Sequence, residues 1–339
     1  MFCVLLNLSG CSGKQEIDPY LRSLGLDYIE KELIEVADLN QFGVLMVNEF
    51  AVYEDDWIAF RGQRDQYFVS LLNIRTGQEI PLLRKGRGPG EFSSPIGFDA
   101  KPQSLLVSDS SSHTIVSVDI PESIAAGCAV LDTVLQWKDV PYMVRPHYLS
   151  SGFFVTSGIN PNNPEWFTLR DGNGQMLSGV PAPFSDDIKS MDMSALASFV
   201  GSTIFTSETT GDRFCAAMVS AAALSFSVTE NGLLQEICRI EAIPPRTVTI
   251  NSGGKIQKTS KRYFASICSD KRGVYLLYSG ELLGQTPYSE EAKYMVMYDW
   301  DGCPRSYYKL STYVRYMTVW DGHVFFVTNN PTTKLLTIK

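Results

Sequence analysis

The chain has 339 residues, of which 44% are hydrophobic and 12% aromatic, and its formal net charge is −8. This length and apolar content allow a large buried core, and closed all-β folds of this size can form one domain. The negative charge argues against a nucleic-acid partner, because such a surface needs a basic face that neutralises phosphates.

The N-terminal segment, MFCVLLNLSGCSGKQ, has a short apolar run that ends in small residues before Cys11. The run is shorter than the roughly 18 apolar residues that indicate a membrane-spanning helix. Leu8-Ser9-Gly10-Cys11 resembles a bacterial lipobox, in which the cysteine carries a lipid; the alternative is a buried first strand. We expect residues 1–11 to be a signal and lipobox segment, followed by a polar tether over residues 12–27. The protein would then lie in the bacterial cell envelope and reach the membrane through its lipid anchor only.

Residues 28–339 contain six copies of one unit: a strand, a tight turn and a strongly apolar strand. In most copies a second pair of strands follows, around turns such as Asn231-Gly232 and Asp301-Gly302, whose residues tolerate positive φ. The copies recur at steps of roughly 50 to 60 residues, beginning near Val47, Pro95, Tyr142, Ser202, Tyr263 and Tyr316.

Four strands per unit at this period predict an all-β fold, a six-bladed β-propeller with four-stranded antiparallel blades. The last copy ends one strand short at the C-terminus. We expect a segment between Tyr28 and Asn40 to supply the missing outer strand, so that an N-terminal strand closes the ring.

The stretch LLRKGRGPGEF, Leu82 to Phe92, combines alternate glycines with basic residues and suggests a phosphate cradle. Its glycine spacing fits neither the dinucleotide fingerprint nor the P-loop, and Pro89 removes one backbone donor. We interpret Gly86 to Gly90 as a structural connection and expect a positive φ at Gly88.

The stretch from Gly86 to Ile120 resembles the NHL repeat of six-bladed propellers. The match lies in Gly88-Pro89-Gly90, Phe92, Pro95, Asp109-Ser110 and His113 to Ile115. The whole chain resembles the TolB-like or NHL-like propeller lipoproteins of Bacteroidetes. This resemblance implies that the glycine-rich segment links the outer strand of one blade to the inner strand of the next.

Loops on one face of such a propeller are the first candidate for function, because loops on rigid scaffolds often carry binding sites. We expect a monomer that binds a protein, peptide or glycan through this face. The candidate binding residues are Arg61, Arg64, Arg87, Asn160, Asn162, Trp166 and Tyr288.

The alternative is an enzyme, a lyase or hydrolase acting on glycan or peptide in the central funnel. His147 and Arg145 are two residues apart on an inner strand, so alternation places both on one face; an acid partner is not identifiable from the sequence. No catalytic or metal-binding motif occurs, and the cysteines lack a C-x-x-C spacing, so we predict no metal and no cofactor. A carboxylate within hydrogen-bond reach of His147 would favour the enzyme.

Overall fold

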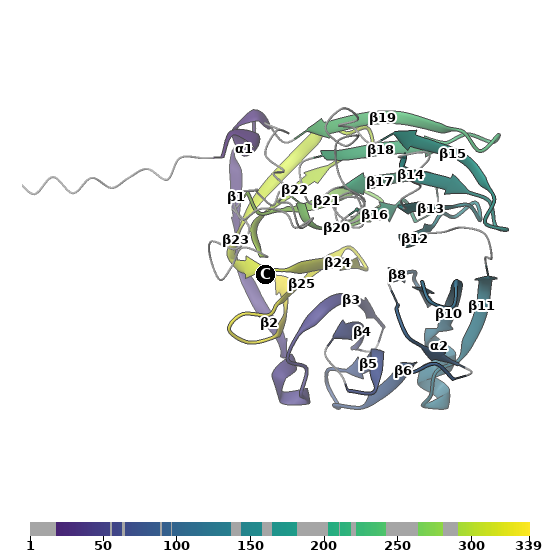
Figure 1. Cartoon of the computed structure of the whole chain (residues 1–339). Helices are drawn as coiled ribbons and strands as arrows, with labels where there is room; N and C mark the ends of the chain where they lie inside the picture. The colour runs from purple at the N-terminus through teal and green to yellow at the C-terminus, as the bar shows by residue number, and fades with distance from the viewer. Residues whose placement is uncertain are drawn as a thin grey trace, which may run out of the picture.

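The computed structural model describes residues 18–54, 56–62, 65–88, 90–95, 97–136, 144–157, 165–181, 203–209, 211–217, 222–241, 264–280 and 291–339. These residues form six sheets around a central channel, a six-bladed β-propeller (Figure 1). The fold predicted from the repeats is confirmed, and each repeat supplies the first two strands of one blade.

Each blade runs from an innermost strand at the channel to an outer strand at the rim. The innermost strands, in blade order, are β3 (Val47–Tyr53), β8 (Asp99–Ala100), β12 (Val144–Tyr148), β16 (Ile204–Ser207), β20 (Phe264–Asp270) and β24 (Tyr316–Trp320). The second strands are β4 (Trp57–Gly62), β9 (Ser104–Asp109), β13 (Phe154–Ser157), β17 (Arg213–Ala217), β21 (Gly273–Tyr278) and β25 (His323–Thr328). The second strands are rich in β-branched and aromatic residues, which suit a pleated surface buried on both faces.

The outer half of each blade is another antiparallel pair. The third strands are β5 (Tyr67–Asn73), β10 (Thr114–Asp119), β14 (Glu165–Arg170), β18 (Ala222–Val228), β22 (Ala292–Tyr298) and β26 (Lys334–Ile338). The outer strands of blades one to five are β6 (Glu79–Lys85), β11 (Leu131–Gln136), β15 (Met176–Pro181), β19 (Leu234–Glu241) and β23 (Pro304–Val314). In blade two, the short helix α2 (Ile120–Ala126) lies between the third and outer strands, a helix that the repeat pattern does not predict.

The ring is closed by β2 (Leu33–Asp38), which pairs antiparallel with the C-terminal strand β26. The register places Leu33 opposite Ile338 and Asp38 opposite Lys334. The 3-10 turn η1 (Leu39–Phe42) then leads into blade one. The prediction that a segment between Tyr28 and Asn40 completes the last blade is confirmed. Just upstream, β1 (Tyr28–Lys31) adds in parallel to β23 of blade five.

The apolar core is divided among the interfaces between neighbouring blades. Between blades one and two, for example, Leu71 packs in one cluster with Leu105 and Val107. Between blades six and one, Phe60 and Val327 share a cluster. Because each interface is filled from both sides, the innermost strands are held at a fixed spacing around the channel.

The segment before β1 packs on the propeller. In helix α1 (Pro19–Ser23), Tyr20 is buried against the cluster between blades four and five, and its hydroxyl lies 2.7 Å from that of Tyr298. The Tyr278 hydroxyl donates to Asp18 Oδ1 at 2.6 Å. Part of the stretch expected to be a tether, residues 18–24, is therefore docked. Residues 1–17, with Cys11, lie outside the described residues, and no described helix is long and apolar enough to cross a membrane.

The glycine-rich segment connects blade one to blade two, as expected. After it, β7 (Glu91–Phe92) turns back and pairs in parallel with β6. The Gly88 N–H donates to Glu91 Oε2 at 2.9 Å, so a carboxylate of the chain itself occupies the place that a phosphate would need. The expected positive φ at Gly88 is wrong: it occurs at Gly90, where φ is +73°.

Candidate functional site

The six innermost strands surround a cavity of about 790 Å³ in the centre of the ring. This volume lies within the range of small-molecule sites, roughly 300 to 1,000 Å³. Apolar side chains such as Phe50 and Trp320 line it together with a few polar and charged groups. Three of the polar groups, Asp99, His147 and Ser207, lie on β8, β12 and β16, the innermost strands of blades two, three and four.

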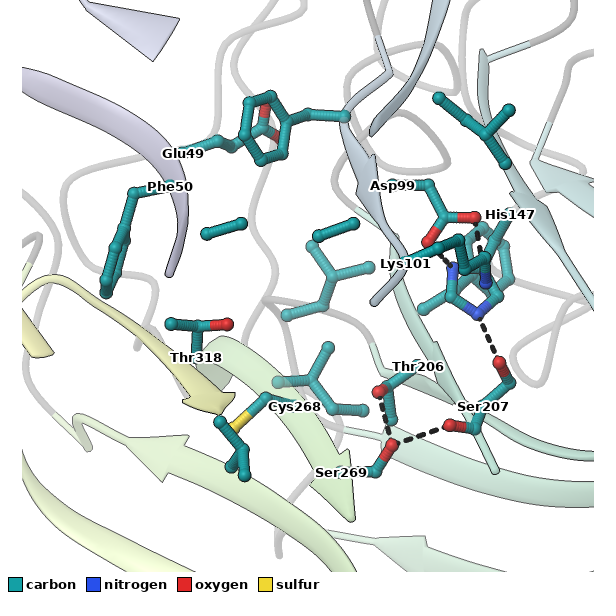
Figure 2. A pocket seen from close by; sticks show the side chains of 18 of the residues that line it. Glu49, Phe50, Asp99, Lys101, His147, Thr206, Ser207, Cys268, Ser269 and Thr318 are labelled. Carbon is teal, nitrogen blue, oxygen red and sulfur yellow. Dashed lines mark hydrogen bonds and ion pairs between the residues drawn. The ribbon is translucent and has the colours of Figure 1, made fainter. Parts of the chain in front are cut away.

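Three of these polar side chains form one hydrogen-bonded chain across three blades. His147 Nδ1 lies 2.9 Å from Asp99 Oδ1, and His147 Nε2 lies 2.8 Å from the Ser207 hydroxyl oxygen. Figure 2 shows the three side chains joined in this order on one wall of the pocket. Asp99 and His147 are buried, whereas Ser207 is only partly buried and borders the cavity.

Further hydrogen bonds hold the Asp99 carboxylate in place. Asp99 Oδ2 accepts from the Tyr148 N–H at 2.8 Å and lies 3.2 Å from Lys101 Nζ. Lys101 Nζ also donates to the Tyr148 carbonyl at 2.6 Å. Both carboxylate oxygens are therefore occupied, and the oxygen that faces His147 has a fixed direction.

The surroundings set the charges of Asp99 and His147. Burial lowers the pKa of His147 below its usual value and outweighs the opposing attraction of Asp99, so the imidazole is neutral near pH 7. Burial alone would raise the pKa of Asp99, but His147, Lys101 and the Tyr148 N–H together lower it to about 2. An ionised Asp99 can only accept, so Nδ1 of His147 carries the ring proton and Nε2 is left to accept the Ser207 O–H.

A bulge in β12 aims His147 at its two partners. The register with β13 shifts between Val144 and His147, and Arg145 has a φ of +51°. A non-glycine residue in this region is strained, and bulges of this kind redirect side chains next to functional sites. Pro146 follows the strained residue and limits the backbone further. The simple alternation expected for Arg145 and His147 is thus broken, although both side chains still border the cavity.

A second charged group joins blades one and three: Glu49 lies on β3, Arg61 near the end of β4 and Arg145 on β12. Arg61 Nε is 2.8 Å from Glu49 Oε2, and Arg145 Nη1 is 3.8 Å from Glu49 Oε1. All three residues border the same cavity as His147. Arg61, one of the candidates expected on the loop-rich face, lies in β4 and borders this cavity.

The remaining candidate residues of the loop-rich face are mostly untested. Arg87 is exposed on the glycine-rich connection. Trp166 lies in β14, but its side chain is outside the described part of the chain. Outside the described residues altogether are Arg64, Asn160, Asn162 and Tyr288.

Sequence reasoning missed Asp99 and Ser207. Each lies about one blade away from His147 along the chain, and neither belongs to a short catalytic motif. The signal that could have indicated them is their position in the repeat, because each lies on the innermost strand of its own copy. Among the described residues, no group of three or more His, Cys, Asp or Glu side chains is placed to hold a metal ion.

No model of a known protein family matches the chain, and no curated protein matches its sequence. Similar solved structures include regucalcin, a calcium-binding protein from Agrobacterium tumefaciens, at 9% identity and a TM-score of 0.49 over 92% of this chain and 95% of that one. AztD from Citrobacter koseri is 12% identical, with a TM-score of 0.44 over 83% of this chain and 67% of that one. The Cps50 (Swd1) β-propeller domain from Myceliophteria thermophila is 8% identical, with a TM-score of 0.47 over 91% of this chain and 98% of that one. Identities this low and TM-scores below 0.5 do not support an inference about activity. Membership of the TolB-like or NHL-like lipoproteins stays a prediction.

Proposed function

We propose that the protein is a hydrolase that cleaves an ester or related acyl bond inside its central channel. Ser207 is the nucleophile, His147 the general base and Asp99 the carboxylate that orients the imidazole. The observation that carries this proposal is the continuous hydrogen-bonded chain from Asp99 through His147 to Ser207. Nucleophile, base and orienting acid in this order and at these distances are the recurring arrangement of acyl-transfer sites.

The proposed reaction has two halves. The Ser207 oxygen attacks the acyl carbon while its proton passes to His147 Nε2, and the imidazolium then donates this proton to the leaving alkoxide. The acyl group is left on Ser207 as an ester. Water attacks this ester, His147 takes the proton from the water, and the same proton returns to the Ser207 oxygen as the acid is released.

The open edge of β16 supplies a donor for the oxyanion. In an antiparallel pair, alternate residues direct their N–H and C=O groups to the partner strand. Glu208 N–H donates to the Arg213 carbonyl at 2.9 Å, so the backbone groups of Ser207 point to the opposite edge of the strand. Consistent with this, the Ser207 carbonyl accepts from the Ser269 hydroxyl of the next blade at 2.8 Å. The Ser207 N–H therefore points to the channel edge of β16, where it would be the backbone donor for the oxyanion.

A fluorophosphonate probe tests this assignment, since such probes label activated serines. We expect labelling of Ser207 in the full chain, with release of 4-nitrophenol from 4-nitrophenyl butyrate. Both should be lost in Ser207→Ala. Ser266 is the matched control: it borders the same channel, but its hydroxyl bonds to the backbone of Met317 and not to a histidine. Ser266→Ala should keep labelling and hydrolysis; labelling that persists in Ser207→Ala would overturn the proposal.

The lipid anchor and the envelope location belong to the same proposal. Leu8-Ser9-Gly10-Cys11 supports them, because small residues before a cysteine are what lipid attachment requires at such a site. The native protein should partition into a detergent phase, and Cys11→Ser should move it to the aqueous phase. A wild-type protein that already stays in the aqueous phase would contradict the anchor.

A further inference from the structure

At the mouth of the channel, the described cluster of Glu49, Arg61 and Arg145 carries two positive charges and one negative charge. Arg61 and Arg145 share one carboxylate, Glu49, at 2.8 Å and 3.8 Å respectively. Lys101, the other cation of the cavity wall, is already bound to Asp99 and to a backbone carbonyl. One guanidinium charge at the mouth is therefore not compensated by a described residue.

These two guanidinium groups are only partly engaged within the described residues: Arg61 Nη1 donates one long hydrogen bond, to the Pro95 carbonyl at 3.5 Å. The Arg145 and Arg61 side chains are 31% and 25% exposed, and both border the cavity. Arg61 Nε and Glu49 Oε2 are close, but neither atom makes a well-aligned hydrogen bond within the described part of the chain. Arg145 borders the cavity from a strained backbone position, and such strain persists only where the surrounding structure holds the residue in place.

We propose that Arg61 and Arg145 bind a carboxylate group of the substrate, so that the hydrolase acts on esters of acids that carry a second, free carboxylate. This inference rests on the proposed function for the reaction, but the anion site rests on its own contacts. A guanidinium matches a carboxylate with two parallel hydrogen bonds. One uncompensated positive charge matches a monoanion, whereas a phosphate monoester would bring nearly two negative charges next to Glu49.

The two candidate groups lie on one strand. Arg145 and His147 both border the cavity from β12, and the bulge between Val144 and His147 sets their relative directions. An acid with two or three carbons between its carboxylate and its ester carbonyl is the simplest substrate that carries both groups. The carboxylate would then lie at Arg145 while the ester carbonyl reaches Ser207.

Binding is tested without hydrolysis in Ser207→Ala, with two probes of matched length. We expect calorimetry to detect monomethyl succinate, which carries one carboxylate, and not methyl butyrate, which carries none. Arg145→Gln and Arg61→Gln should each weaken binding about tenfold or more, while Glu49→Gln should strengthen it, because the competing carboxylate is gone. Arg75→Gln is the charge-matched control: Arg75 is 78% exposed, pairs with Asp56 and does not border the cavity.

The kinetic arm compares 4-nitrophenyl hydrogen succinate with 4-nitrophenyl butyrate on the wild-type chain. We expect a higher kcat/KM for the succinate ester and loss of this preference in Arg145→Gln, whereas Arg75→Gln should keep the wild-type preference. Equal binding of both probes, binding that survives Arg145→Gln, or tighter binding of methyl phosphate than of monomethyl succinate would overturn the anion site. Carboxylate binding without any hydrolysis would instead refute the proposed reaction and leave the anion site standing.

Discussion

At the scale of single residues, the protonation of His147 should make the proposed hydrolysis depend on pH. The folded-state pKa of His147 lies below the usual 6.5 because burial disfavours the imidazolium. The neutral ring required of a general base is therefore present throughout the physiological range. We expect kcat/KM for ester hydrolysis to stay level from pH 8 down to about 6.5 and to fall only below it. A pH–rate profile whose acidic limb lies above pH 7 would contradict a buried, neutral base.

The same shift affects stability. Near and below pH 6.5 the unfolded chain binds a proton at His147 that the folded chain does not, so the free energy of unfolding falls as the pH is lowered. Urea unfolding at pH 7.5 and pH 5.5 should show this loss in the wild type and a smaller loss in His147→Gln. His323, which is exposed on β25, provides the matched control, and His323→Gln should keep the wild-type pH dependence.

In the proposed reaction, Asp99 acts through the tautomer of His147. Asp99→Asn retains the shape, but its side-chain amide can donate to Nδ1, which would place the ring proton on Nε2 and prevent that atom from accepting the Ser207 O–H. We expect kcat to fall at least about 100-fold, the scale of a lost general base. Circular dichroism should confirm a folded variant; a folded Asp99→Asn with nearly wild-type kcat would show that Asp99 has no orienting role.

At the scale of elements, the glycine-rich connection illustrates both the reach and the limit of sequence reasoning. Its structural role could be predicted because its glycines do not have the spacing of a phosphate-binding loop and because Pro89 lacks a backbone N–H donor. Which glycine needs a positive φ does not follow, because this depends on how β7 folds back onto β6. The structure assigns this conformation to Gly90 and gives Gly88 a hydrogen bond to Glu91 instead.

Two alanine substitutions separate these roles. Gly90→Ala places a Cβ in open space but in the left-handed region, so only backbone strain opposes it, and we expect a loss of about 1 to 2 kcal/mol. Gly88→Ala meets only the flexible end of Glu91, at 3.1 Å, and should lose less than about 0.5 kcal/mol. Chemical denaturation of both variants measures the difference; equal losses would show that strain at Gly90 is not the controlling factor.

The bulge in β12 marks a second limit at this scale. Strand alternation correctly drew attention to His147 and Arg145, since both border the channel. It could not reveal that Arg145 adopts a positive φ, because no glycine or asparagine marks the position. Strand alternation therefore fails on β12. Among the described innermost strands, this is the one that carries both the proposed general base, His147, and a proposed anion-binding residue, Arg145.

At the scale of the whole molecule, the site exists only because the ring is closed. Asp99, His147 and Ser207 lie on three different blades, and the contacts between them cross two blade interfaces. The six repeats predict the number of blades and which strands face the channel. They do not predict which polar side chains meet there, because the rotation between blades and the β12 bulge decide this together.

Ring closure can be tested by shortening the N-terminus in three steps. A chain that starts at Asp18 keeps every described element and should melt like the wild type. A chain that starts at Leu33 loses α1 and β1, including the buried Tyr20, and should melt lower. A chain that starts at Leu39 also loses β2, which leaves the ladder of β26 unpaired on one side and opens the ring. We expect this last step to lower Tm by a further ~10 °C, since several kcal/mol of pairing and packing are removed.

We expect the kcat for hydrolysis to fall in the same order as Tm across the three shortened chains, because the geometry of the channel depends on ring closure. The loss of α1 and β1 affects the rim of blades four and five, so the Leu33 chain should keep most of its kcat below its own Tm. Without β2, blades six and one can separate, and the spacing of the innermost strands is no longer fixed by a continuous ring of interfaces. The Leu39 chain should therefore lose kcat even at temperatures where circular dichroism shows intact strands. If it instead keeps wild-type kcat and Tm, the N-terminal strand does not hold the channel in shape.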